Sequence, residues 1–517
     1  MKIEKWKGGL IYLFYIGTGS IFLWLVLNII LNAQYIDHTS YGGAFYVQNF
    51  YNPFWLMIFT VMLAVFLYFL YFVLQKYHVG KKFFFVMLII IVLLQISCAY
   101  YLEFDISEPG KFTDLGVIID AAQSIIAGEV YFNDYFYNTP YQAGIVSELV
   151  LWYQFVNLFG VKSFNISCIL LNILSIDTAI IGIYFLAKEV LGCAAANISL
   201  VLSVLFTPYF SYTTYYYTDT LSMPYPVLAL LLYILLEKYG KKENRNLWVL
   251  RSGYLLLGFV LALGIYIKAS VAVVLIAILI HLFFSNLDFH TIIKMELMIV
   301  VVLLFQLVSF SIIDSADWFP YNLTEAKGYP KTMWFLMGTN EQRYGAYAPE
   351  DVALMLEERT YERRSKKCVQ ALKERLETNG LEWYIKFLTK KNVWMWGDGK
   401  YFASEVLAWF PHERESKILE YFSQEADGKK GFCYWSQSVQ IFLLIFMLLS
   451  FRKGKQNLSV NPMFLVHLCI FGIFLFMSLW EARPRYLLNM APLFILSATD
   501  GIDFIIRRRK YENENKQ

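Results

Sequence analysis

FFFVMLIIIVLLQISCAYY, residues 83–101, is a strongly apolar run without a charged side chain. A helix of that length crosses the roughly 30 Å of hydrocarbon in a bilayer. Backbone groups exposed to lipid must be hydrogen-bonded within their own segment, so an isolated run of this kind is expected to be helical. The run therefore predicts a transmembrane helix.

Similar runs recur along the whole chain, which has 517 residues, 58% of them hydrophobic and 16% charged. A soluble domain is usually about a quarter charged. The further predicted spans are 10–32, 54–75, 164–187, 193–210, 221–237, 252–267, 270–285, 296–313, 436–451, 463–480 and 491–506. The predicted class is thus an all-α polytopic membrane protein with about twelve transmembrane helices.

Lysine and arginine gather in alternate connections between these spans, among them 76–82, 238–251 and 452–462. Because basic residues concentrate in cytoplasmic loops, this alternation predicts a multi-pass protein of the cell membrane with both termini in the cytoplasm. The basic start MKIEKWK leads into a long apolar run that we interpret as an uncleaved first span.

The same alternation divides the chain into three parts. They are a transmembrane domain, 1–313, with outer loops 102–163 and 211–220; an extracytoplasmic helical loop domain, 314–435; and C-terminal transmembrane helices with a basic cytoplasmic tail, 436–517. The apolar segment 143–160 would break the alternation if it spanned, so we expect an interfacial or re-entrant helix on the outer side. In the loop domain, Pro349 is expected to open a helix that Gly380 ends.

Several classes of function find no support in the composition. The net charge of +3 does not indicate a nucleic-acid partner. The six cysteines form no CxxC pair and the six histidines no HxxxH or HExxH spacing, so no transition-metal site is predicted.

The first outer loop contains EFDISEPGKFTDLGVIIDAAQSIIAGEVYFNDYFYNTPYQAG, residues 103–144, with Asp105, Asp114 and Asp134 among its acids. Acidic residues are ordinary in outer loops, because lysines are kept inside. Asp114 differs from the others because it directly precedes an expected short helix over 115–127, which its carboxylate could cap. A carboxylate held at the membrane face can also act as a general base.

This loop resembles the first outer loop of the GT-C glycosyltransferases, and within them the family 39 protein mannosyltransferase and aminoarabinose transferase type. The matching residues are Asp114, Ala121, Ala122, Gly128, Tyr131, Asp134, Asn138 and Pro140. The resemblance extends over about 95–285. It implies that Asp114 is the catalytic base and that Asp219 is a second outer acid that arranges the site. Asp219 could instead cap the span that starts at Leu221.

A phosphate-bearing donor needs cations, and three stand on the outer side by the alternation. Lys268 lies between two apolar runs, where it either faces the site or extends to the interface. Arg483 and Arg485 lie in WEARPRYLLNMAP, and the Arg485-Tyr486 pair is similar to an Arg-Tyr of the family. Glu481 could pair with either arginine. Arginine grips phosphate through two parallel hydrogen bonds.

The resemblance implies a glycosyltransferase of the outer face that inverts the anomeric centre. Its partners would be a polyprenyl-phosphate sugar donor, the lipid bilayer, and a glycan, lipid or protein acceptor. Asp105, Asp134, Asn138 and Tyr486 are further candidate site residues. No cofactor is indicated; a divalent ion would be compatible with two acids, but nothing in the sequence requires one.

Three alternatives remain open from the sequence. A secondary transporter would carry ionisable residues near mid-span, where Asp177 is the main example here. A polysaccharide polymerase or ligase of the envelope would share the large outer loop but use a diphosphate-linked chain. A purely structural membrane protein would have no use for Asp114.

Overall fold

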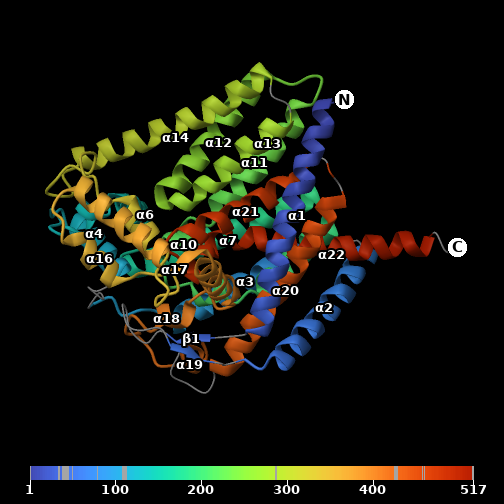
Figure 1. Cartoon of the computed structure of the whole chain (residues 1–517), viewed down its shortest axis with the longest axis horizontal. Coiled ribbons are helices and arrows are strands. Elements are labelled where there is room, and N and C mark those ends of the chain that lie inside the picture. The colour runs from blue at the N-terminus through green and yellow to red at the C-terminus, as the bar shows by residue number, and fades with distance from the viewer. Residues whose placement is uncertain are drawn as a thin grey trace.

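Long apolar helices form most of the computed structural model of the chain (Figure 1). It describes residues 2–32, 35–37, 46–48, 51–77, 80–107, 113–285, 288–423, 429–456, 458 and 460–514. In these residues, ten helical segments are long and apolar enough to cross a membrane. The helices that form them are α1 (Lys2–Leu31), α2 (Pro53–Lys76), α3 (Lys81–Tyr101), α7 (Phe164–Val190), α11 (Pro224–Gly240), α12 (Leu247–Ile267), α14 (Phe289–Ser315), α20 (Lys429–Gln456), α21 (Pro462–Leu479) and α22 (Ala491–Glu514).

The predicted all-α polytopic class is confirmed. Each of the twelve predicted runs contains an apolar helix, but two of these helices are short. They are α8 (Cys193–Leu205) and α13 (Ala272–Ser285), which follows the 3-10 turn η2 (Ala269–Val271). Because a spanning helix needs about 20 residues, ten spans are supported by length and the count of twelve stays a prediction.

Several helix starts are encoded by their first residues. The Asn52 side chain accepts a hydrogen bond from the Phe54 amide, and Asn461 does the same for Phe464. Proline follows each of these caps, at Pro53 and Pro462. An asparagine cap satisfies an amide that has no partner inside the helix, and proline at the first position has no amide to satisfy.

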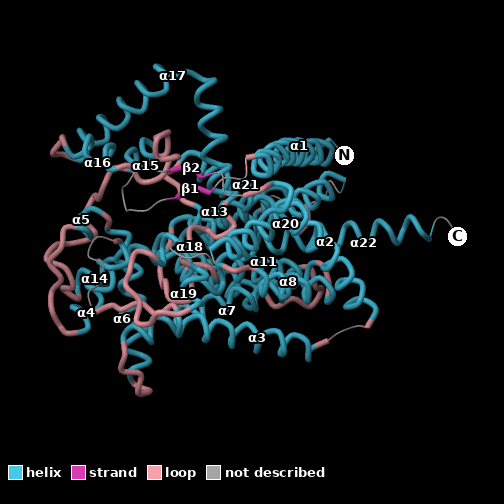
Figure 2. The backbone as a smooth tube through the Cα atoms, turned by 90° about the horizontal axis from the view of Figure 1, so that it is seen from below, coloured by secondary structure: helices cyan, strands magenta, loops and turns pink. Residues whose placement is uncertain are grey.

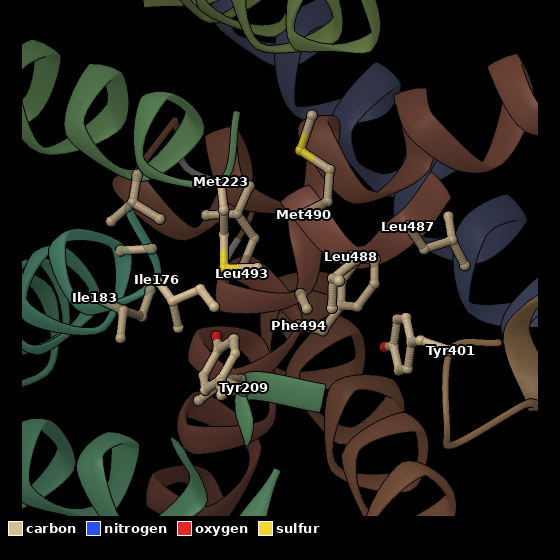
Figure 3. Close-up of a cluster of buried hydrophobic side chains, with 14 of the residues drawn as sticks. Ile176, Ile183, Tyr209, Met223, Tyr401, Leu487, Leu488, Met490, Leu493 and Phe494 are labelled. Carbon is tan, nitrogen blue, oxygen red and sulfur yellow. The ribbon is translucent and has the colours of Figure 1, made fainter. Parts of the chain in front are cut away.

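Helices α7, α20 and α22 contribute to the centre of the bundle. Figure 3 shows Ile176 and Ile183 of α7 near Tyr209 and Leu493, with Phe494 of α22 beside them. All five side chains are buried. Because lipid is as apolar as these residues, close packing rather than exclusion from water holds such helices together.

Helices α20 and α22 pack closely at Gly501, where a Cβ atom would overlap the backbone carbonyl of Phe446. We expect Gly501→Ala to lower the free energy of unfolding in detergent by about 1–3 kcal/mol, because the two helices must separate. Gly17→Ala is the matched control, since a Cβ there meets nothing within 4 Å. Gly17→Ala should be neutral or slightly stabilising; equal losses from the two variants would contradict the packing argument.

A polar network ties the C-terminal part of α20 to the middle of α22. Lys453 Nζ lies 2.5 Å from Asp500 Oδ1 and 3.4 Å from Asp503 Oδ2. Ser450 Oγ donates to Asp500 Oδ2 at 2.7 Å, and Tyr71 of α2 donates to Asp503 at 2.7 Å. Charged groups inside a membrane domain are costly unless paired, and these carboxylates each have a cation and a hydroxyl donor.

The connections of 102–163 and 314–435 lie together at the left of Figures 1 and 2, whereas both termini lie at the right. The first connection forms α4 (Asp114–Ile126), α5 (Tyr135–Asn138), η1 (Pro140–Gln142) and α6 (Ala143–Asn157). The second forms α15 (Lys331–Met337), α16 (Pro349–Leu356), α17 (Tyr361–Gly397), α18 (Ala403–Leu407) and α19 (Lys417–Phe422). Which side of the membrane this end faces stays a prediction.

Short elements complete the described chain. They are β1 (Tyr35–Asp37) and β2 (Tyr46–Gln48), which pair antiparallel, α9 (Pro208–Ser211), α10 (Thr218–Leu221) and η3 (Pro484–Met490). Helix α6 has 15 residues, fewer than a spanning helix needs. Its placement at the interface stays a prediction.

The single helix predicted from Pro349 to Gly380 is wrong. Pro349 does begin α16, but α16 ends at Leu356, and Thr360 caps a new helix by accepting the Arg363 amide. Gly380 has φ +76° and ψ 178° and does end the first arm of α17, as predicted, although a second helical arm follows it. Glycine adopts this left-handed φ without the steric cost that a Cβ atom would bring.

Candidate functional site

Three separate segments meet around the fully buried carboxylate of Asp219. Asp219 lies in α10, Lys268 follows the last residue of α12, and Arg485 lies in η3. The carboxylate forms ion pairs with both Lys268 Nζ and Arg485 Nη1. Asp219 is therefore not a helix cap, and Lys268 is not extended to the interface, because both side chains are committed to this cluster.

Arg485 keeps donor capacity beyond its ion pair. Its guanidinium carbon lies 4.9 Å from the ring centroids of both Tyr217 and Tyr486. Within the described residues, Arg485 Nε has no hydrogen-bond partner, although the side chain is buried. Since a guanidinium carries five N–H donors, Arg485 can hold Asp219 and still donate to a second anion.

Glu481, Arg483 and Tyr486 form the adjoining part of the cluster. Tyr486 donates its hydroxyl hydrogen to Glu481 Oε2 at 3.0 Å, and Arg483 Nε lies 4.0 Å from Glu481 Oε1. The Arg483 guanidinium also lies 5.4 Å from the Phe402 ring and 5.8 Å from the Trp409 ring. Of the two arginines, Arg483 is thus the one that pairs with Glu481, whereas Arg485 pairs with Asp219.

Asp114 stands at the first position of α4, and its expected role as the helix cap is wrong. The cap is the preceding residue, Thr113, whose hydroxyl oxygen accepts the Gly116 amide at 3.1 Å. Two tyrosines face the half-buried Asp114 carboxylate instead. Tyr135 donates to Oδ1 at 3.0 Å, and Tyr217 donates to Oδ2 over a longer distance of 3.5 Å. Among the described residues, no backbone amide hydrogen-bonds to the Asp114 carboxylate.

Gln142 directs the hydroxyl of Tyr217 towards Asp114. Its amide nitrogen donates to the Tyr217 oxygen at 2.8 Å, which leaves the phenol hydrogen to point at the carboxylate. Burial, reinforced by the Asp114 charge, raises the pKa of Tyr217 well above its ordinary value. The phenol thus stays protonated and remains a donor.

Tyr217 separates the two kinds of charge in the site. Its hydroxyl faces Asp114, while its ring lies against the Arg485 guanidinium. Among the described residues, no lysine or arginine forms an ion pair with Asp114. The Asp114 carboxylate and the Arg485 guanidinium thus both contact Tyr217 but form no ion pair with each other.

Three predicted candidates do not join this arrangement. Asp105 accepts the Ser107 amide and hydroxyl at 2.9 and 2.6 Å in a local turn. Asp134 is exposed, and Asn138 donates to its backbone carbonyl at 3.0 Å. In the described part of the chain, none of the three hydrogen-bonds to Asp114, Asp219 or the cations.

The site residues missed from the sequence are Tyr135, Gln142, Tyr217 and Lys391. Tyrosines are common at the ends of many predicted spans, so the sequence did not distinguish Tyr135 and Tyr217, which donate to Asp114, from the others. The run Tyr215-Tyr216-Tyr217 directly before Asp219 was the available signal. Metal binding has no ready ligand set in the described residues, where no three His, Cys, Asp or Glu side chains gather.

Lys391 of α17 anchors the segment that carries the arginines. It is completely buried, and its Nζ donates to three backbone carbonyls: Gly338 at 2.9 Å, Ser478 at 3.2 Å and Trp480 at 2.6 Å. These carbonyls lie at or beside the C-terminal ends of α15 and α21, where a cation is favourable. Lys391 therefore fixes the start of the stretch that leads to Arg483.

We expect Lys391→Met to lower the free energy of unfolding by about 1–3 kcal/mol or more, because buried carbonyls lose their donor. Lys373→Met is the matched control, since Lys373 lies on the first arm of α17 with its side chain 71% exposed. Chemical unfolding in detergent micelles measures both variants. An unchanged unfolding midpoint for Lys391→Met would show that the ammonium is not the anchor.

Fold and site together define a multi-span helical membrane protein with a buried charged cluster at one end. The chain belongs to the family described as conserved hypothetical integral membrane protein, whose model matches residues 2–503. No curated protein sequence matches the chain.

The solved structures that align with it include those of two proteins. The archaeal oligosaccharyltransferase AglB from Archaeoglobus fulgidus, in complex with an inhibitory peptide and a dolichol-phosphate, is 14% identical, with a TM-score of 0.43 over 85% of this chain and 52% of that one. ArnT from Cupriavidus metallidurans, bound to undecaprenyl phosphate, is 13% identical, with a TM-score of 0.35 over 81% of this chain and 78% of that one. Both are GT-C glycosyltransferases. The chain spans about half the length of the oligosaccharyltransferase.

Proposed function

We propose that this protein is a glycosyltransferase of the cell membrane, with both termini in the cytoplasm. It would move a sugar from a polyprenyl-phosphate donor to an acceptor hydroxyl on the outer face, with inversion. The observation that carries the proposal is the arrangement around Tyr217, with Asp114 on its hydroxyl side and Arg485 on its ring. A general base and a phosphate-binding group are thereby held close without forming an ion pair.

Asp114 is the proposed general base. An acceptor hydroxyl is a weak nucleophile at neutral pH, and a carboxylate that takes its proton during attack accelerates transfer. The hydroxyls of Tyr135 and Tyr217 orient this carboxylate without cancelling its charge.

Arg485 and Lys268 are the proposed ligands of the donor phosphate, with Arg483 beside them. Asp219 holds the first two cations together through its ion pairs, so they are in place before a donor binds. Cations fixed in a site from which water is excluded stabilise charge that develops on a leaving group far better than they do in water. Asp219 therefore positions the cations and needs no contact with the sugar.

In the proposed step, the acceptor oxygen forms a bond to the anomeric carbon as its proton passes to Asp114. The bond between that carbon and the phosphate oxygen breaks, and its electron pair leaves with the polyprenyl phosphate. Arg485 and Lys268 offset the charge of this leaving group. Attack from the face opposite the phosphate inverts the anomeric centre.

The test compares the surface glycans of cells that lack the protein with those of the same cells carrying the wild-type gene. We expect one sugar to be missing, and its polyprenyl-phosphate donor to accumulate in the membranes. Purified wild-type protein, supplied with the extracted donor lipid and with envelopes of the deletion cells as the source of acceptor, should then consume the donor and release polyprenyl phosphate. Unchanged glycans together with an unconsumed donor would overturn the function, and restored glycans without donor consumption would favour a transporter.

A further inference from the structure

A pocket of about 180 Å³ lies apart from the Asp114 cluster, where α1, α17 and α20 come together. Its lining includes Ile29 and Asn32 at the end of α1, Lys386, Lys390 and Trp394 of α17, and Gln437 of α20. The pocket is smaller than the roughly 300–1,000 Å³ that encloses a drug-sized ligand. It therefore suits a single headgroup-sized occupant.

The pocket lies at the end of a membrane span. Ile29 belongs to the apolar segment Trp6–Leu31, and Asn32 follows it directly. The second arm of α17, which begins after Gly380, runs beside this end of α1 (Figure 2). Since the polar headgroup layer begins where the hydrocarbon core ends, the pocket lies at headgroup depth.

Two lysines make the pocket cationic, and their present partners hold them weakly. Lys386 pairs with Glu382 four residues earlier, but the two side chains are 75% and 82% exposed. Lys390 Nζ lies 3.9 Å from Glu341 and 4.5 Å from the ring centroid of Tyr344. Exposed pairs of this kind are worth about 0–1 kcal/mol, so a phosphate could replace either glutamate.

Exposed apolar side chains lie close in sequence to the residues that line the pocket. Leu381 and Ile385 of α17 are exposed on the arm that carries the lysines, and Leu27 and Leu31 of α1 are exposed on the span. An apolar surface beside lysines at the bilayer boundary is the combination that holds a lipid by both of its parts.

We propose that this pocket binds the phosphate headgroup of an anionic phospholipid, with the acyl chains lying along α1. Lys386 and Lys390 would contact the phosphate, and the exposed Asn32 side chain offers polar groups for the rest of the headgroup. The bound lipid would fasten the second arm of α17 to the membrane. This site is independent of the proposed transfer reaction.

The test measures how tightly the full-length protein, purified in an uncharged detergent, retains added phosphatidylglycerol or phosphatidylcholine, by native mass spectrometry. The test variant is the double substitution Lys386→Gln with Lys390→Gln. The matched control is Lys327→Gln with Lys373→Gln, which also removes two exposed lysines that face glutamates, Glu362 and Glu377. Neither pair is buried, so all of these proteins should fold.

We expect wild type to retain phosphatidylglycerol more tightly than phosphatidylcholine, and the test variant to lose about 30-fold in affinity for phosphatidylglycerol, as two lysines near a membrane surface would contribute. The control should stay within about twofold of wild type. Equal losses of phosphatidylglycerol affinity in both variants would show an effect of general surface charge. An unchanged affinity of the test variant would show that this pocket is not a lipid site. A further arm adds inorganic phosphate; saturable binding of free phosphate without preference between the two lipids would also overturn a lipid site.

Discussion

Asp114→Asn is expected to lower kcat for sugar transfer by about 10²–10⁴-fold, the usual contribution of a general base. Asparagine fits the same space and still accepts hydrogen bonds from Tyr135 and Tyr217, but it cannot take a proton from the acceptor. Because Arg485, a proposed ligand of the donor phosphate, lies against the ring of Tyr217 and not at its hydroxyl, the KM for the donor should change little. The measurement is the initial rate of polyprenyl phosphate release by purified protein.

Asp134→Asn is the control, since Asp134 is an exposed acid of the same loop that forms no hydrogen bond or ion pair with the cluster in the part of the chain that the structure describes. It should transfer at the wild-type rate. If Asp114→Asn also keeps the wild-type rate while transfer is measurable, another group must take the proton. A rise in the KM for the donor with little change in kcat would instead place Asp114 among the donor-binding groups.

Asp219→Asn should be the most destabilising single substitution in the cluster. It leaves Lys268 and Arg485 buried beside a neutral amide, with side chains only 13% and 3% exposed. Removing one partner of a buried ion pair typically costs about 3–5 kcal/mol, because the remaining charge is left uncompensated. The measurement is the free energy of unfolding in mixed detergent micelles, with Asp134→Asn as the control.

A second variant separates this explanation from a general packing defect. Adding Lys268→Met to Asp219→Asn removes one of the two uncompensated cations, so part of the lost stability should return. Such a non-additive recovery is the signature of directly interacting residues. If the double variant is less stable than Asp219→Asn by the full cost of Lys268→Met alone, the buried charges do not account for the loss.

The helices were predictable because each long apolar run has one stable form in lipid. The errors in the predicted helix starts arose where more than one polar side chain could accept a hydrogen bond from the first amides of a helix. Thr113 rather than Asp114 caps α4, and Thr360 starts a new helix inside a segment with continuous helical periodicity. A sequence pattern predicts the approximate position of a helix cap. Which side chain accepts the hydrogen bond depends on the local backbone geometry.

The grouping of the candidate site residues was predictable in part, while their roles stay a proposal. The alternation of basic loops placed Asp114, Asp219, Lys268, Arg483 and Arg485 at one end of the molecule, and the structure brings the last four close together with Asp114 alongside. The pairing of Asp219 with both Lys268 and Arg485 joins positions far apart in the chain, so no local pattern could reveal it. Lys391 was hidden because it lies in a helix rich in exposed lysines.

The three hydrogen bonds of Lys391 link the stability of distant segments. Its ammonium joins the end of α15, the end of α21 and the second arm of α17. A local opening that frees any one of them must give up hydrogen bonds to a buried charge, so the three are expected to open together as one cooperative unit. Hydrogen exchange at the amides around Gly338, Lys391 and Trp480 would then share a single opening free energy, and the arginines would keep their positions for as long as that unit stays closed.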